Sequence, residues 1–251
     1  MDIENKTTFV VGGSSGLGKG VVERFLAHNA KVGVFDLNQG ALTHENLIYC
    51  SGDVVDEESV SFALKETQQK FGESPRIVVY CAGTSAPGMR VTSSKVRLPL
   101  ETFRRVIDVN LTGCFNVMSQ AAEQMLKLDP LDDGERGVII NTASIGAEDG
   151  PMGTVPYSTS KAGMVGMTLP AARDLAVYGI RVNCISPGSF VTPLFDQIPD
   201  PMQQHLKAQT PFPKRFGDVT EFAELVSHLI NNRMINGENI RIDGALRMAF
   251  I

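Results

Sequence analysis

The segment from Thr7 to Gly18 reads TTFVVGGSSGLG, and it contains the features that decide the fold. Its β-branched and aromatic residues predict a buried strand, and a glycine-rich turn follows directly. Beyond the turn, apolar residues at positions 21, 22, 25 and 26 recur with helical spacing. A strand, a glycine turn and a helix together favour phosphate binding, because the backbone can approach a pyrophosphate at the positive helix end. The spacing is Gly-x-x-x-Gly-x-Gly, so a glycine-rich turn without a ligand is the alternative.

Asp36 ends a second predicted strand, residues 31–36, eighteen residues beyond Gly18. A carboxylate at this point accepts hydrogen bonds from both ribose hydroxyls of a dinucleotide and repels a 2′-phosphate. The next residues, Leu37 and Asn38, supply no positive charge to attract that phosphate. The pattern therefore favours NAD over NADP as the cofactor. For Asp36 taken alone, a turn-capping aspartate is the alternative.

Tyr157 and Lys161, together with Ser144, form the predicted reaction centre. Residues four apart lie on one face of a helix. A free tyrosine has a pKa of about 10, and a lysine ammonium nearby lowers it toward a value useful for a general base. The Ser144 hydroxyl, thirteen residues earlier, would polarise a carbonyl or hold an alcohol. The three residues predict proton transfer to and from an alcohol oxygen, and a surface tyrosine packed beside a lysine is the alternative.

The composition predicts one enzyme domain spanning residues 1–251. A chain of this length can form a single α/β domain, and its net charge of −5 gives no reason to expect a nucleic-acid partner. The four cysteines lack a Cys-x-x-Cys pair and the four histidines lack metal-ligand spacing, so we expect reduced thiols and no metal. The acidic first residues do not resemble a targeting peptide, and no apolar run reaches the roughly 18 residues of a membrane span. We therefore expect a soluble protein in the cytoplasm, with no membrane partner.

Strands and helices alternate along the rest of the chain, which predicts parallel βαβ units. The expected fold is a Rossmann-type doubly wound parallel sheet of about seven strands with helices on both faces. Further strands are expected at residues 47–50, 76–81, 137–142, 181–186 and 239–243, and helices at 57–71, 101–127, 156–177 and 219–230. Residues 84–100 and 189–213 fit neither element. Loops of that length are typical of lids or binding loops, with plain surface loops as the alternative.

These motifs stand in the order found in the short-chain dehydrogenases/reductases, and the chain resembles this family over nearly its whole length. The resemblance is carried by the glycine turn, Asp36, Asp53-Val54, Cys81-Ala82-Gly83, Asn110, Ser144, Tyr157 with Lys161, and Pro187-Gly188. More narrowly, the chain resembles the 3-hydroxyacyl-CoA dehydrogenase branch in segments 137–144, 161–170, 172–175, 211–213 and 242–248. The family is usually tetrameric, which implies a homotetramer packed through the small residues Ala162-Gly163, Gly166 and Ala171-Ala172. Internal packing of those residues is the alternative.

The resemblance implies a role for each of these residues. Tyr157 would be the acid/base, Lys161 would assist it and bind the nicotinamide ribose, and Ser144 would orient the substrate oxygen. Asn110 would anchor a water for proton relay, with a helix-kinking or capping asparagine as the alternative. Phe190 would close over the nicotinamide, or would simply be a core aromatic. The implied cofactor contacts are Gly12, Ser15, Gly16, Leu17, Gly18, Asp36, Asp53, Val54, Cys81, Ala82, Gly83, Tyr157, Lys161, Pro187, Gly188, Phe190 and Thr192.

Three residues depart from the family pattern. Tyr80 stands where an asparagine is usual, and Val11 replaces a common threonine before the first glycine. Pro156 directly precedes Tyr157, which is acceptable at a helix start because the missing amide proton would be unpaired there. None of the three removes a reacting group, so the expected chemistry stands.

The expected function is NAD-dependent interconversion of a secondary alcohol and a ketone, and the resemblance implies a 3-hydroxyacyl-CoA as substrate. A steroid, a simple secondary alcohol and a carrier-protein-bound 3-oxoacyl group are alternatives. Carrier-protein reductases usually prefer NADPH, so Asp36 argues against them. Proteins of this branch also act as partners in larger assemblies, including RNA-processing ones. A dehydrogenase-like binding scaffold is therefore the non-enzyme alternative, against which the intact catalytic set argues.

The two long loops carry apolar and cationic residues that would suit an acyl-CoA. An apolar slot would hold an acyl chain, and a cationic rim would attract the phosphates of coenzyme A. Ordinary solvated loop residues are the alternative. The apolar residues are Met89, Val91, Leu98, Phe190, Leu194, Phe195 and Ile198, and the cations are Arg90, Lys95, Arg97, Lys207, Lys214 and Arg215.

Overall fold

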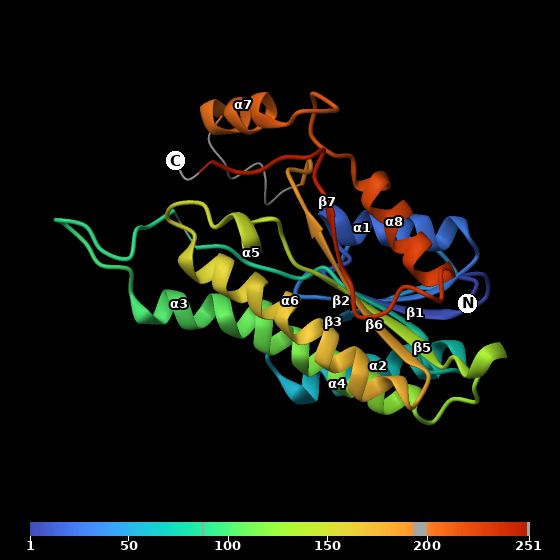
Figure 1. The fold of residues 1–251 in the computed structure, drawn as a ribbon. Coiled ribbons are helices and arrows are strands. Elements are labelled where there is room, and N and C mark those ends of the chain that lie inside the picture. The colour runs from blue at the N-terminus through green and yellow to red at the C-terminus, as the bar shows by residue number, and fades with distance from the viewer. Residues whose placement is uncertain (87, 193–199, 250–251) are drawn as a thin grey trace.

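Seven strands form one sheet in the computed structural model, which describes residues 1–86, 88–192 and 200–249 (Figure 1). The strands are β1 (Thr7–Val11), β2 (Lys31–Asp36), β3 (Leu47–Ser51), β4 (Ile77–Tyr80), β5 (Gly137–Thr142), β6 (Ile180–Pro187) and β7 (Asn239–Ile242). Their order is β3-β2-β1-β4-β5-β6-β7, and every neighbouring pair is parallel. The predicted doubly wound sheet is confirmed, and each predicted strand agrees to within one residue at either end.

Helices cover both faces of the sheet, with α2, α4 and α6 on one face and α1 and α8 on the other (Figure 1). Along β1, Phe9 and Val11 pack into the core under α2 and α4, whereas Val10 packs with α1 and α8. This alternation follows from the two-residue period of a strand. The helices are α1 (Gly16–Ala27), α2 (Glu57–Phe71), α3 (Leu100–Ile107), α4 (Gly113–Met125), α5 (Gly146–Asp149), α6 (Val155–Ala176), α7 (Asp200–Gln209) and α8 (Val219–Asn231), with a 3₁₀ turn at Asp132–Gly134.

Two expectations for the helices were wrong. Residues 189–213 were expected to hold no regular element, but α7 lies within them. Pro201 is the second residue of α7, where a missing amide proton costs no hydrogen bond. The single helix expected at 101–127 is instead α3 and α4 joined by the π turn η1 (Asp108–Thr112). A π turn inserts an extra residue into a helix, and such turns are frequent at functional sites.

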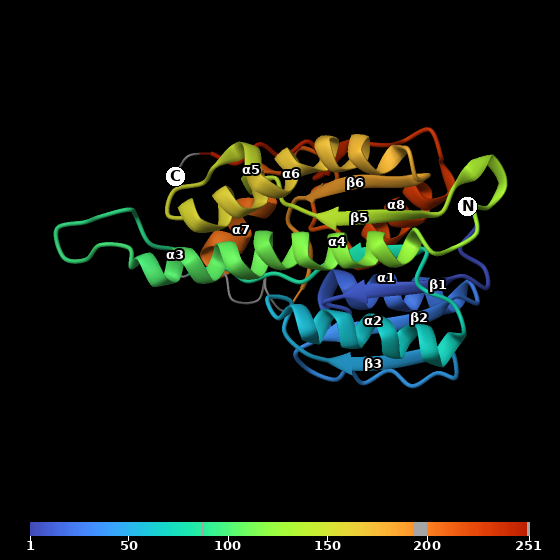
Figure 2. The ribbon, with the colours of Figure 1, turned by 90° about the horizontal axis from the view of Figure 1, so that it is seen from below.

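The carboxyl ends of the strands lie beside α5, α7 and the segment before α3 (Figure 2). This segment projects beyond the body of the protein, where Thr92 and Arg97 pair as an antiparallel bridge. The backbone of Met89 donates a hydrogen bond to the carbonyl of Gly153 at 3.2 Å, which ties the base of the projecting segment to the turn before α6. Within the described residues, no helix is both long enough and apolar enough to cross a membrane.

Candidate active site

The residues predicted to carry the reaction come from three elements near the carboxyl edge of the sheet. Ser144 lies two residues beyond β5, Asn110 lies in η1, and Tyr157 and Lys161 lie on the first two turns of α6. The strand order reverses between β1 and β4, next to β5. Doubly wound sheets bind ligands outside the carboxyl ends of the strands at such a reversal.

Lys161 places a buried positive charge against the Tyr157 ring. The side chain is only 4% exposed, and Nζ donates a hydrogen bond to the carbonyl oxygen of Thr142 at 2.7 Å. Nζ lies 5.8 Å from the centre of the Tyr157 ring. A Cβ added to Gly83 would lie 3.6 Å from Nζ, so the ammonium also faces the segment that follows β4. The structure therefore brings Tyr157 and Lys161 together as the sequence predicted.

Ser144 and Tyr157 converge on one point beside Gly146. A Cβ added to Gly146 would lie 3.5 Å from Ser144 Oγ and 3.6 Å from Tyr157 Cε1. The backbone N–H of Gly146 donates to Ser144 Oγ at 3.1 Å. Because Oγ accepts this bond, the hydroxyl hydrogen is left to donate to another group, and a substrate oxygen is such a group.

Asn110 is fully buried and links the segment after β4 to α6. Its Nδ2 donates to the Thr84 carbonyl oxygen and to Ser160 Oγ, each at 2.9 Å, and its Oδ1 accepts from the Thr84 N–H at 2.8 Å. Ser160 Oγ donates in turn to the Tyr157 carbonyl oxygen at 2.7 Å. Both amide hydrogens of Asn110 are thus used inside the protein. The helix-distorting interpretation of Asn110 agrees with its place in the π turn.

Tyr80, which departs from the family pattern, supports the same π turn. Its side chain is 1% exposed, and its hydroxyl donates to the carbonyl oxygen of Val109 at 2.7 Å. Burial raises the pKa of Tyr80 well above its ordinary value, so the hydroxyl keeps its proton at physiological pH. Tyr80 therefore ties the end of β4 to the residue directly before Asn110.

The glycine turn after β1 brings two backbone segments very close together. Gly12 has a φ of +75°, and a Cβ there would lie 2.7 Å from the Ala82 Cα. A Cβ on Gly18 would overlap the Gly12 carbonyl oxygen. Ser15 precedes α1 but makes no side-chain capping bond, so no serine hydroxyl covers the first N–H groups of the helix. This narrow turn and uncapped helix end fit the pyrophosphate of a dinucleotide.

Asp36 is held beside the glycine turn by two backbone amides. The N–H of Ser14 donates to Oδ2 and the N–H of Asn38 donates to Oδ1, each at 3.1 Å. A carboxylate has about four acceptor positions, so positions remain for ribose hydroxyls. Asp53, at the next strand end, is exposed, whereas Val54 is buried and its carbonyl accepts from the Asn116 side chain at 2.9 Å.

Pro187 and Gly188 lie at the end of β6, where the Gly188 N–H donates to the Ile242 carbonyl oxygen at 2.9 Å. Phe190 is 6% exposed and packs edge-on against Phe222 of α8, with ring centres 6.4 Å apart. The ring of Phe190 therefore packs in the core, as the alternative interpretation expected. Thr192 is partly buried.

Burial disfavours the thiolate form of the cysteines. All four are free, as expected, and burial raises the pKa of Cys81 and of Cys184 to about 11. Burial also raises the pKa of Cys114, in spite of the nearby Lys161 charge. Among the residues that the structure describes, no group of three or more His, Cys, Asp or Glu side chains is arranged so that it could hold a metal ion.

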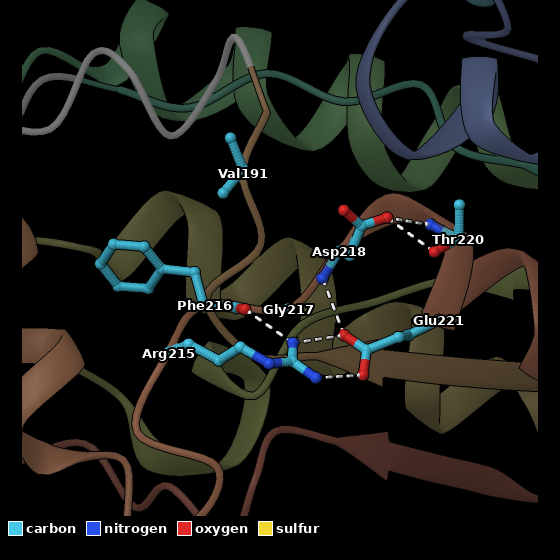
Figure 3. A pocket seen from close by; sticks show the side chains of 7 residues that line it. All are labelled: Val191, Arg215, Phe216, Gly217, Asp218, Thr220 and Glu221. Atoms are coloured by element: carbon cyan, nitrogen blue, oxygen red, sulfur yellow. Dashed lines mark hydrogen bonds and ion pairs between the residues drawn. The ribbon is translucent and has the colours of Figure 1, made fainter.

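A cavity of about 390 Å³ lies at the start of α8 (Figure 3). Two bonds of 2.7 Å join the Arg215 guanidinium to the Glu221 carboxylate, and these bonds lower the pKa of Glu221 to about 2. Neither Ser144, Tyr157 nor Lys161 lines this cavity. Its lining residues are Val191, Arg215, Phe216, Gly217, Asp218, Thr220 and Glu221.

The sequence-based interpretation missed three residues that position the predicted site. Ser160 lies inside the motif, and its spacing of three from Tyr157 could have indicated a bond to the Tyr157 carbonyl. Gly146 could have been suspected from its place two residues after Ser144. Thr84 gave no signal, because its partner Asn110 lies 26 residues away.

Comparison with known proteins identifies the family. The model of the family described as short chain dehydrogenase matches residues 6–203. The chain belongs to this short-chain dehydrogenase family. This short-chain dehydrogenase is 43% identical over 253 residues to the 3-hydroxyacyl-CoA dehydrogenase type-2 of Bos taurus, a match that covers 98% of this chain and 97% of that protein.

Two crystal structures resemble this short-chain dehydrogenase over nearly their full length. The 3-hydroxyacyl-CoA dehydrogenase type-2 from Mycobacterium avium gives a TM-score of 0.90 at 32% identity and covers 98% of both chains. The 3-ketoacyl-(acyl-carrier-protein) reductase from Brucella melitensis, complexed with NADH, gives a TM-score of 0.87 at 25% identity. That match covers 98% of this chain and 100% of the reductase.

Proposed function

We propose that this short-chain dehydrogenase is an NAD-dependent oxidoreductase that interconverts 3-hydroxyacyl-CoA and 3-oxoacyl-CoA. The observation that carries the reaction class is the convergence of Ser144 Oγ and the Tyr157 ring on one point beside Gly146, with the Lys161 ammonium close to that ring. The 3-hydroxyacyl-CoA dehydrogenases among its relatives support the substrate class.

In the oxidising direction, the Tyr157 phenolate takes the hydroxyl proton of the substrate. Ser144 donates its hydroxyl hydrogen to the same oxygen, because its Oγ already accepts from the Gly146 N–H. The buried charge of Lys161 stabilises both the phenolate and the negative charge that develops on the substrate. In the reducing direction Tyr157 returns the proton. Asn110 and Ser160 hold the start of α6 in place for these steps.

A dinucleotide would lie across the strand ends from β2 to β6. The turn from Gly12 to Gly18 would hold its pyrophosphate, Asp36 its adenosine ribose, and Asp53 with Val54 its adenine. The nicotinamide end would contact Lys161 and the segments that carry Cys81-Ala82-Gly83, Pro187-Gly188 and Thr192. When bound, the nicotinamide supplies the hydride acceptor or donor. The NADH complex of the Brucella melitensis reductase supports this cofactor.

The segment before α3 is the proposed docking site for coenzyme A. Arg90, Lys95 and Arg97 are all exposed on it, as is Val91 at 60% exposure. Its base is bonded to Gly153, four residues before Tyr157, which ties the segment to the turn before α6. Exposed cations attract phosphates through a field that salt screens. Three apolar candidates for the acyl slot, Leu194, Phe195 and Ile198, lie outside the described residues.

Absorbance of NADH tests the proposal directly. We expect a higher kcat/KM with acetoacetyl-CoA than with free acetoacetate or its methyl ester, and we expect salt to weaken the CoA substrate selectively. Tyr157→Phe keeps the ring but removes the transferable proton, so turnover should fall by about 10²–10⁴-fold while NADH binding persists. Near-normal turnover of Tyr157→Phe would reject the acid/base role. Similar kcat/KM values with and without CoA would reject the acyl-CoA substrate and leave a simple secondary-alcohol dehydrogenase.

We also propose a homotetramer in the cytoplasm. A Cβ added to Gly166 on α6 would meet no atom within 4 Å. Leu169, three residues further along α6, is 44% exposed, and Phe115 on α4 is 58% exposed. Small residues beside exposed apolar ones suit the close packing of helices between subunits. The four reduced thiols fit a reducing compartment. Light scattering after gel filtration should give four times the chain mass of 27.2 kDa, and a monomer mass would reject the assembly.

A further inference from the structure

Arg241 is the centre of a cluster of ion pairs at the end of β7. Its side chain is 14% exposed, and all five of its N–H groups have acceptors. Two bonds of 2.9 and 3.1 Å join the guanidinium to the carboxylate of Asp149, which is only 6% exposed. The other three go to Glu148 Oε2 at 2.9 Å, Asp243 Oδ2 at 2.8 Å and the Leu246 carbonyl oxygen at 3.0 Å.

This cluster joins the two sides of the predicted active site. Glu148 and Asp149 form the last half of α5, on the side of Ser144. Asp243 lies on the side of Gly188, where a Cβ added to the glycine would lie 2.8 Å from the Asp243 Cβ. The Met248 N–H also donates to Asp149 Oδ2 at 2.9 Å. The chain after β7 therefore holds α5 through the same carboxylate that Arg241 grips.

The short helix α5 needs such external support. It has only four residues, and a single helical turn is unstable on its own because nucleation fixes several dihedrals for one hydrogen bond. Gly146, its first residue, donates the N–H that Ser144 Oγ accepts. A shift of α5 would therefore rotate or release the Ser144 hydroxyl. A misplacement of about 1 Å at a reacting group can cost up to about 10²-fold in rate.

We propose that Arg241 is a positioning residue, which fixes α5 through Asp149 so that the Gly146 N–H orients the Ser144 hydroxyl toward the substrate oxygen. The inference rests on the proposed role of Ser144. All five N–H groups of Arg241 are bonded within the protein, so we assign it no contact with the substrate or the cofactor. Its effect passes through α5, and it should therefore disappear when the Ser144 hydroxyl is absent.

A double-mutant cycle on the full chain with NADH and acetoacetyl-CoA tests this. Arg241→Met keeps most of the side-chain length but removes the guanidinium group, and we expect kcat to fall about 10–100-fold. In a Ser144→Ala background the same change should lower kcat less than about twofold, because the hydroxyl it positions is gone. Equal losses in both backgrounds would overturn the proposal. Asp149→Asn keeps the size of the side chain and should follow the same pattern if Arg241→Met does not fold.

Arg247 offers a matched control from the same cluster. It pairs with Asp243 at 3.0 Å and is 64% exposed, and its hydrogen bonds go to Asp243 and Leu246 rather than to α5. Arg247→Met should leave kcat within about twofold of wild type, and a loss as large as that of Arg241→Met would overturn the proposal.

Hydrogen exchange of the cofactor-free protein gives a readout that needs no substrate. Amides of residues 145–149 should exchange at least about tenfold faster in Arg241→Met than in Arg247→Met, since α5 opens when its support is lost. Equal exchange in the two variants would overturn the proposal. If the wild type proved inactive on acetoacetyl-CoA, the proposed function would fail, whereas this exchange experiment would still test the support of α5.

Discussion

Replacing Tyr80 with phenylalanine removes one buried hydroxyl and leaves the ring in place. That hydroxyl donates to the Val109 carbonyl oxygen at 2.7 Å inside the core. The variant loses the bond and leaves a buried carbonyl without this donor, which costs about 1–3 kcal/mol. For a chain of 251 residues, each kcal/mol corresponds to about 2–4 °C in Tm. We therefore expect Tm to fall by about 2–12 °C, and kcat to fall as well, because Val109 directly precedes Asn110.

Unfolding can be followed by circular dichroism, since the chain contains no tryptophan for a fluorescence assay. Tyr178→Phe is the matched control. Tyr178 is 45% exposed, so its hydroxyl is not enclosed by the core and the free energy of unfolding should change by less than about 0.5 kcal/mol. If Tyr80→Phe and Tyr178→Phe had the same stability, the Tyr80 hydroxyl would not support the π turn, and the reasoning would be refuted.

Three further predictions follow from charged residues. Asp36→Ala combined with Leu37→Arg should raise kcat/KM for NADPH relative to NADH by about tenfold or more, and equal use of both cofactors by the wild type would contradict the role of Asp36. Glu135 is 6% exposed, is bonded to Arg181 at 3.0 Å, and precedes β5 at the end of that strand opposite Ser144. Glu135→Gln should lower the free energy of unfolding by about 3–5 kcal/mol without changing kcat. A loss of stability below about 1 kcal/mol would contradict this prediction. Burial opposes ionisation of Asp149, but its bonds to Arg241 and Met248 outweigh burial and lower the pKa of Asp149. The stability that ionised Asp149 adds is therefore fully present above the ordinary carboxyl pKa of about 3.9, and it is lost as pH falls through the lowered pKa. Urea titrations from pH 5 to 3 should show a smaller loss of the free energy of unfolding for Asp149→Asn than for the wild type.

The strands were predictable because each is a short apolar segment that has a fixed place in the alternation of strands and helices along the chain. Residues 137–142 form a continuous apolar run with one polar pair, which is typical of a strand buried on both faces. Residues 57–71 start after Asp56, whose side chain accepts from the Glu58 N–H, and end at Gly72 with a φ of +80°. Local capping chemistry of this kind is visible in a sequence, so the bounds of α2 were predicted correctly.

The π turn and the cluster around Arg241 were not predictable, because both depend on partners far away in the sequence. Asn110 is held by Thr84 and Ser160, which lie 26 and 50 residues from it. Arg241 reaches Asp149 across 92 residues. No periodicity or spacing encodes such pairs, and only the sheet brings them together. The helix α7 was missed for a local reason rather than a long-range one. The prolines around it outweighed its weak helical pattern.

The glycines of the first turn show how far one motif can support a function. Gly12 and Gly18 are both required by contacts within the protein, because a side chain on either would collide with neighbouring backbone. Their pattern therefore explains the turn without any ligand. The Asp36 carboxylate is different, because the two amides that hold it leave acceptor positions open beside the turn. Packing alone explains the glycines, but it gives no reason for a carboxylate beside the turn. The case for NAD in this chain consequently depends on Asp36 more than on the glycines, and the cofactor-switch experiment tests it at that residue.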